Sequence, residues 1–171
     1  MTDATTPASS PTSTPPPAAT NASTSESKPE GKAPEPEPTD ELVSTRHTVT
    51  VEGGRVLDYT ATTGRLVLRE EVYEDGVFTG HTAKAQVSMT SYVLEGLSAQ
   101  ERAARPVTFA FNGGPGSSSV WLHLGLLGPR RVVMGDVGAL LPPPYELADN
   151  AQTLLAESDL VFIDPVSTGY S

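Results

Sequence analysis

The residues of this chain that are best suited to chemistry lie in one glycine-rich segment, FNGGPGSSSVW over residues 111–121. An apolar run ends at Asn112, and three of the next four residues are glycines, namely Gly113, Gly114 and Gly116. Glycine loses much backbone entropy on folding and adds no side-chain packing. So much glycine at one point indicates a place where bare backbone N–H groups are needed.

The neighbouring sequence predicts a strand before this segment and a helix after it. Residues 106–111 are apolar and rich in β-formers, and residues 117–127 have helical spacing with Ser117 or Ser118 as the N-cap. Three uses are open for such a turn: a phosphate site, a structural turn, or the oxyanion hole of an α/β-hydrolase. The phosphate motifs G-x-G-x-x-G and G-x-x-x-x-G-K-[ST] are both absent, which disfavours the first use.

The rest of the chain predicts an α/β fold with an antiparallel edge. Residues 46–94 alternate apolar and polar side chains and read as antiparallel strands. Their expected turns are Glu52–Gly54, Thr63–Gly64 and Asp75–Gly76. Further on we expect a loop over 130–148, a short helix over 150–158 and a buried strand over 159–163, covered on both faces as in a parallel sheet.

Composition separates a tail from an ordered domain. The first 40 residues hold nine prolines, no aromatic residue and no Val, Ile or Leu. Such a segment buries too little apolar area to offset the entropy of ordering it. We therefore expect a disordered tail over 1–42 and a domain over 43–171.

Composition also narrows the classes of partner. The net charge of −10 argues against nucleic acid, and no apolar run is long enough to span a membrane. The chain has no cysteine and only three scattered histidines, so we expect neither a thiol nucleophile nor a metal site, and no cofactor. Because no secretory signal is visible, the cytoplasm is the default location, with export open if the gene starts elsewhere. Nothing indicates an oligomeric state.

The glycine-rich segment and the residues after it resemble the serine carboxypeptidases, which are α/β-hydrolases. Residues 112–119, NGGPGSSS, are similar to that family's Asn-Gly-Gly-Pro-Gly-Cys-Ser-Ser signature. The pair Gly128-Pro129, the segment 150–153 and the block 161–171 (VFIDPVSTGYS) come next in the family's order. The resemblance covers residues 106–171. It implies an incomplete α/β-hydrolase fold and hydrolysis of C-terminal peptide bonds.

Carried over residue by residue, the resemblance implies three roles in the turn. The Gly114 N–H would be one donor of the oxyanion hole. Asn112 and the Gly113 N–H would hold the C-terminal carboxylate of a peptide or protein substrate, which aligns the last peptide bond for attack.

The sequence departs from the family pattern in ways that affect function. Ser117 replaces the family's cysteine, and Leu126 replaces an acid that helps to bind the substrate carboxylate. The family's catalytic serine, aspartate and histidine would all lie beyond Ser171, so we expect this chain alone to be inactive. The alternative is a non-catalytic remnant that binds an anion or a peptide.

Internal substitutes for the missing triad are not favoured. Ser171 lacks the sequence of a nucleophile elbow, and the helical pair Ser119 and His123 has no carboxylate placed to orient the histidine. The two remaining histidines, His47 and His81, are expected to be surface residues of strands.

Overall fold

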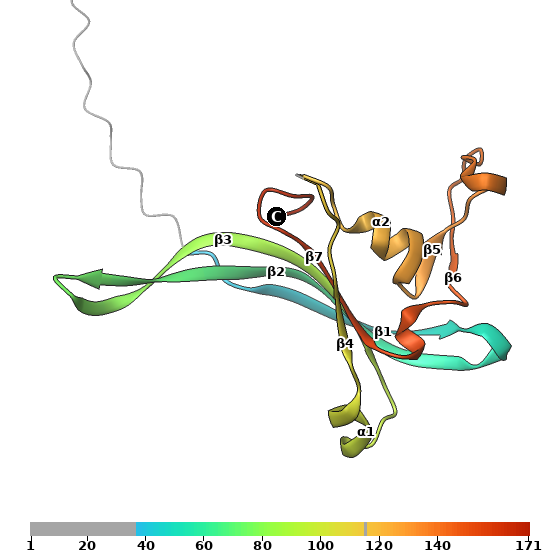
Figure 1. Ribbon diagram of the computed structural model, residues 1–171, viewed down its shortest axis with the longest axis horizontal. Helices are drawn as coiled ribbons and strands as arrows, with labels where there is room; N and C mark the ends of the chain where they lie inside the picture. The colour runs from blue at the N-terminus through green and yellow to red at the C-terminus, as the bar shows by residue number, and fades with distance from the viewer. Residues whose placement is uncertain (1–36, 115) are drawn as a thin grey trace, which may run out of the picture. The chain divides into compact units, whose positions relative to one another are not determined.

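The computed structural model describes residues 37–114 and 116–171, and the structural statements below concern these residues (Figure 1). The expected tail falls almost wholly outside them. The first strand begins at Glu41, two residues inside the range expected for the tail.

The core of the fold is a five-stranded mixed sheet with the order β1-β2-β3-β7-β4. These strands are β1 (Glu41–Thr50), β2 (Val56–Glu74), β3 (Val77–Leu94), β7 (Asp159–Asp164) and β4 (Val107–Ala110). All neighbours are antiparallel except β4 and β7, which are parallel. The predicted sequence of antiparallel strands followed by a parallel pair is confirmed, and the described chain is mostly strand with few helices.

Two of the three predicted turns join strands as expected. A 3-10 turn, η1 (Glu52–Gly54), links β1 to β2. Asp75 and Gly76 link β2 to β3 with φ angles of 51° and 79°. Two successive positive φ values define the type I′ hairpin turn, whose twist matches that of the strands and which favours Asp-Gly.

The turn predicted at Thr63–Gly64 is wrong, because β2 runs through it as one strand of 19 residues. Gly64 has φ 152° and pairs with Leu42 of β1. A Cβ on Gly64 would lie 1.8 Å from the carbonyl oxygen of Glu41. Glycine is therefore needed here for the close approach of two strands rather than for a turn.

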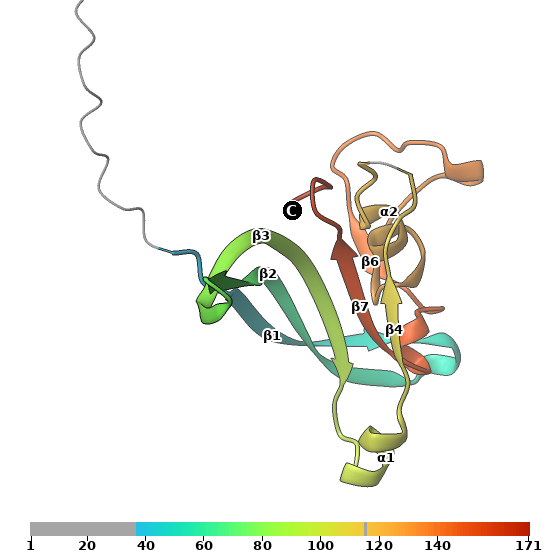
Figure 2. The same cartoon turned by 60° about the vertical axis from the view of Figure 1, so that its left-hand side comes forward.

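The parallel pairing of β4 and β7 brings two of the segments that resemble the serine carboxypeptidases, residues 112–119 and 161–171, to one end of the sheet. Phe109 of β4 pairs with Val161 of β7. Figure 2 shows the chain leaving both strands at the same end, where the glycine-rich turn and the last residues lie. The short helix α1 (Ala99–Ala104), closed by a capping box between Ser98 and Glu101, lies at the opposite end.

The helix after the glycine-rich turn is shorter than predicted. An α-helical turn, α2 (Val120–Leu122), continues as a π-helical segment, η2 (His123–Leu127). The N-cap is Ser119, so the prediction of Ser117 or Ser118 is wrong, and the Ser119 side chain makes no capping bond. Ser118 Oγ still accepts from the Val120 N–H at 3.3 Å. The Gly128 N–H donates to the His123 carbonyl at 3.0 Å and closes the π turn.

The region between the helix and β7 contains short strands rather than only loop. β5 (Arg130–Val132) pairs with β6 (Leu147–Asp149), and a 3-10 turn, η3 (Asp136–Gly138), lies between them. The helix predicted over 150–158 is reduced to a 3-10 turn, η4 (Leu154–Ala156). Three-residue strands and turns carry too little periodicity to be detected in a sequence.

The hydrophobic core lies on one face of the sheet. Alternate residues of β7, Leu160 and Phe162, are buried against Tyr92 and Leu155. Their neighbours Val161 and Ile163 are only half-buried. The expectation that both faces of this strand would be fully covered is wrong for the described part of the chain.

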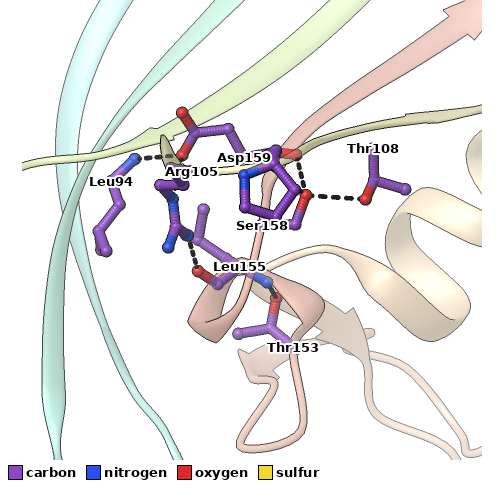
Figure 3. Close-up of polar contacts among 8 residues, drawn as sticks. Leu94, Arg105, Thr108, Thr153, Leu155, Ser158 and Asp159 are labelled. Atoms are coloured by element: carbon purple, nitrogen blue, oxygen red, sulfur yellow. Dashed lines mark hydrogen bonds and ion pairs between the residues drawn. The ribbon is translucent and has the colours of Figure 1, made fainter. Parts of the chain in front are cut away.

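A buried ion pair joins the sheet to its connections (Figure 3). The Arg105 Nε donates to Asp159 Oδ1 at 2.8 Å, and the Arg105 guanidinium also donates to the Leu155 carbonyl. The same Asp159 oxygen accepts from the Leu94 N–H at 3.0 Å. Nearby, the hydroxyl groups of Thr108 and Ser158 lie 2.7 Å apart.

Candidate functional site: a glycine-rich turn at the end of β4

The glycine-rich turn lies directly after β4 and presents bare backbone to solvent. Gly113, Gly114 and Gly116 are exposed, and apart from their chain neighbours no atom of the described residues lies within 4 Å of where their Cβ atoms would be. Gly114 and Gly116 have φ angles of 84° and 80°, which favour glycine over other residues. The Ser117 N–H donates to the Gly114 carbonyl at 3.4 Å. Glycine is thus required both for conformation and for open backbone.

The three residues predicted to bind substrate lie in sequence along this exposed segment. Within the described residues, neither the Gly113 N–H nor the Gly114 N–H donates a hydrogen bond to the backbone. Asn112 is half-buried at the start of the turn. N–H groups without a described backbone acceptor can donate to a carboxylate or an oxyanion, so the roles assigned to these residues stay predictions that the geometry permits.

The far end of the turn is held by Asp164, the last residue of β7. Its Oδ1 accepts from the Ser119 N–H at 2.7 Å and from Ser118 Oγ at 3.1 Å. Its Oδ2 accepts from the Tyr170 N–H at 3.1 Å. Burial by itself would raise the pKa of Asp164, but the hydrogen bonds from Ser119, Tyr170 and Ser118 lower it below its usual value.

The Asp164 carboxylate occupies the backbone donor at the start of α2. The Ser119 N–H precedes α2 and would be a natural donor to a bound anion. Because this N–H already donates to the Asp164 carboxylate, an internal carboxylate takes the place of an external one. In contrast to the Ser119 N–H, the N–H groups of Gly113 and Gly114 have no backbone acceptor among the described residues.

The serine and histidine side chains near the turn do not form a catalytic pair. Ser119 Oγ donates to the Ile163 carbonyl, while His123 Nε2 is hydrogen-bonded to the Tyr92 hydroxyl at 2.5 Å. Ser171 Oγ donates to the Asp164 carbonyl and accepts from the backbone of β3. Each of the three side chains is therefore bonded within the fold rather than to another member of the set.

The ring of His123 is half-buried and packs against the core residue Phe162. It stacks on Phe162, with ring centroids 4.6 Å apart. Burial lowers the pKa of His123 to about 4, although the nearby Asp164 carboxylate acts in the opposite direction. A pocket of about 270 Å³ adjoins this ring, with Ser118, Asp164 and Tyr170 among its lining residues.

The family-like segment 150–153 holds the end of the helix rather than contacting the turn. Asn150 is 2% exposed, and its side-chain N–H groups donate to the carbonyls of Leu126 and Gly128. Thr153 Oγ1 donates to the Leu127 carbonyl at 2.8 Å. These bonds satisfy carbonyl groups that a helix end leaves unpaired. The Leu126 side chain, at the position of the family's acid, is exposed.

Several other sequence expectations can be compared with the described residues. His47 and His81 are exposed residues of β1 and β3, as predicted. No group of three acidic or histidine side chains in the described part is placed to hold a metal ion. None of its helices has the length and apolar character needed to cross a membrane.

The chain is similar to a solved carboxypeptidase structure. No family model and no curated protein matches the chain. Among solved structures, it is similar to Kex1(delta)p, a prohormone-processing carboxypeptidase from Saccharomyces cerevisiae, with 26% sequence identity and a TM-score of 0.44. The match covers 66% of this chain and 20% of that one, so the chain spans about a fifth of the length of the structure it matches.

Proposed function

We propose that this chain is the N-terminal portion of a serine carboxypeptidase-like hydrolase, and that its glycine-rich turn binds the C-terminal carboxylate of a peptide. The observation that carries the proposal is that Gly113 and Gly114, directly after β4, are exposed and that their N–H groups donate to no backbone carbonyl of the described residues. The ordered motifs of residues 106–171 support the same family.

In this proposal the turn has two neighbouring tasks. Asn112 and the Gly113 N–H hold the carboxylate, and the Gly114 N–H stabilises the oxyanion formed when the last peptide bond is attacked. The serine, histidine and aspartate of the triad come from sequence beyond residue 171. An oxyanion hole and substrate binding without a triad give only about 10³–10⁴-fold acceleration over water.

Binding of an N-acetylated dipeptide with a free C-terminus tests the carboxylate role. The chain should bind the free acid at least about tenfold more tightly than the corresponding amide, because hydrogen bonds to a charged group contribute roughly 1.5–3 kcal/mol. NMR titration should place the shifts on the amides of Asn112, Gly113 and Gly114.

Two variants sharpen this measurement. Asn112→Ala should remove most of the preference for the acid, while Gln152→Ala, which removes an exposed amide side chain elsewhere, should keep it. Equal affinity of the parent chain for acid and amide would rule out the proposed carboxylate site.

A second candidate function is a non-catalytic module that binds peptide termini. It needs no triad and therefore agrees with the bonds that engage the side chains of Ser119, His123 and Ser171 within the fold. The two candidate functions can be distinguished in a longer protein that contains the chain. Peptide hydrolysis that a serine-directed phosphonate blocks indicates the enzyme, and peptide binding without hydrolysis indicates the module.

A further inference from the structure

We propose that Asp164 is a positioning residue that sets the shape of the glycine-rich turn from the end of β7. The effect on the turn is independent of the ligand that the turn binds, whereas the relevance of this effect to substrate binding rests on the function proposed above.

The carboxylate of Asp164 connects two segments that are far apart in the sequence. One oxygen accepts from the Ser119 N–H at 2.7 Å and from Ser118 Oγ at 3.1 Å, at the end of the glycine-rich turn. The other oxygen accepts from the Tyr170 N–H at 3.1 Å, in the loop after β7. Bonds in which the acceptor is ionised are about twice as strong as neutral ones.

The turn has few other restraints. Its first residues continue from β4, and its three exposed glycines contribute no side-chain packing. The bond from the Ser117 N–H to the Gly114 carbonyl is long, at 3.4 Å. Ser119 Oγ adds a second bond to β7. The bonds of Ser118 and Ser119 to β7 are therefore a second point, besides β4 itself, at which the sheet restrains the glycines.

The space around the carboxylate is shaped to admit it. A Cβ on Gly169 would lie 2.0 Å from Asp164 Oδ2 and 2.9 Å from Ser118 Oγ. Gly169 also has φ 53°, a left-handed conformation. Asp164 itself is only 7% exposed. Because position 169 is a glycine, there is room for the carboxylate of Asp164, which is otherwise enclosed.

The substitution Asp164→Asn in the full 171-residue chain tests the proposal. Asparagine keeps the shape of the side chain but supplies one carbonyl oxygen, so its NH₂ group must face one of the two backbone donors. Backbone order parameters from ¹⁵N relaxation then report the turn directly. We expect values of about 0.85 for Gly113, Gly114 and Gly116 in the parent and below about 0.6 in the variant.

Two further variants separate positioning from general stability. Ser158→Ala removes a buried hydroxyl near the other end of β7 and should lower global stability while leaving the glycine order parameters unchanged. Ser118→Ala removes only the side-chain bond to Asp164 and should give a smaller loss of order, which keeps the test available if Asp164→Asn does not fold.

Mobile glycines in the parent, or unchanged order parameters in the variants at Asp164 and Ser118 that fold, would overturn the proposal. Neither result involves a ligand. A failure of this proposal is therefore distinguishable from a failure of the carboxylate site, which is tested by the preference for acid over amide.

Discussion

At the scale of single residues, His123 is the group whose environment ties stability to pH. Its half-buried ring stacks on Phe162, and the groups that face it are the Tyr92 hydroxyl and the Asp164 carboxylate. Burial lowers the pKa of the imidazole from 6.5 to about 4. The folded state therefore binds this proton less readily than the unfolded state, and protonation favours unfolding.

We expect the contribution of His123 to the free energy of unfolding to be constant above pH 6.5 and to fall as the pH drops from 6.5 towards 4. The pKa shift corresponds to a total loss of about 3 kcal/mol. The lowered pKa of Asp164 acts in the same direction at still lower pH, because the stability that it contributes is lost once its carboxylate is protonated. Urea unfolding measured at several pH values gives this profile.

Substitution of the histidine identifies the source of the pH dependence. His123→Phe should flatten the profile between pH 6.5 and 4, whatever its effect on the absolute stability. His81→Gln changes an exposed histidine of β3 and should retain the parent's profile. A His123→Phe profile as steep as that of the parent would assign the dependence to other groups.

At the scale of elements, two glycines in the long hairpin of β2 and β3 allow strand contact to be separated from backbone conformation. Gly64 and Gly80 have similar φ angles of 152° and 147°, so alanine meets similar backbone strain at both. At Gly64 the new Cβ would lie 1.8 Å from the Glu41 carbonyl, whereas at Gly80 no atom lies within 4 Å.

Gly64→Ala should therefore destabilise the chain by about 1–3 kcal/mol more than Gly80→Ala, the usual range for forcing an extra carbon into a packed site. The midpoints of urea unfolding measure the difference, provided that the m-values agree. Equal destabilisation would mean that β1 moves away from Gly64 at no measurable cost.

At the scale of the whole molecule, the pair formed by Arg105 and Asp159 links β7, the end of β3 and the turn η4. Its side chains are 9% and 14% exposed, against 57% and 60% for the surface pair of Lys84 and Glu70. Removing one partner of a buried pair leaves a charge without compensation, whereas an exposed pair contributes little.

Asp159→Ala should consequently lower the free energy of unfolding by about 3–5 kcal/mol. Glu70→Ala, the matched change at the surface, should lower it by at most about 1 kcal/mol. Chemical denaturation of both variants checks the comparison. A small effect of Asp159→Ala would show that water reaches Arg105 when its partner is removed.

Much of the local structure could be predicted from sequence because its causes are local. The Asp75–Gly76 turn follows from the positive φ values that a type I′ turn requires. The strand before Asn112 and the exposed glycines after it are likewise predictable from residue types in sequence. The shortened helix, the pairing of β5 with β6 and the continuous path of β2 through Gly64 are not, because they depend on neighbours distant in the chain.

By itself, the sequence determined that bare backbone would come after a strand, since only glycine combines open N–H groups with the φ angles found at Gly114 and Gly116. Only the tertiary structure decided which donors remain free. The parallel pairing of β4 with β7 brings Asp164 to Ser119, 45 residues away in the chain, and this carboxylate takes the donor at the helix start. The N–H groups of Gly113 and Gly114 stay available because no described backbone carbonyl accepts a hydrogen bond from them.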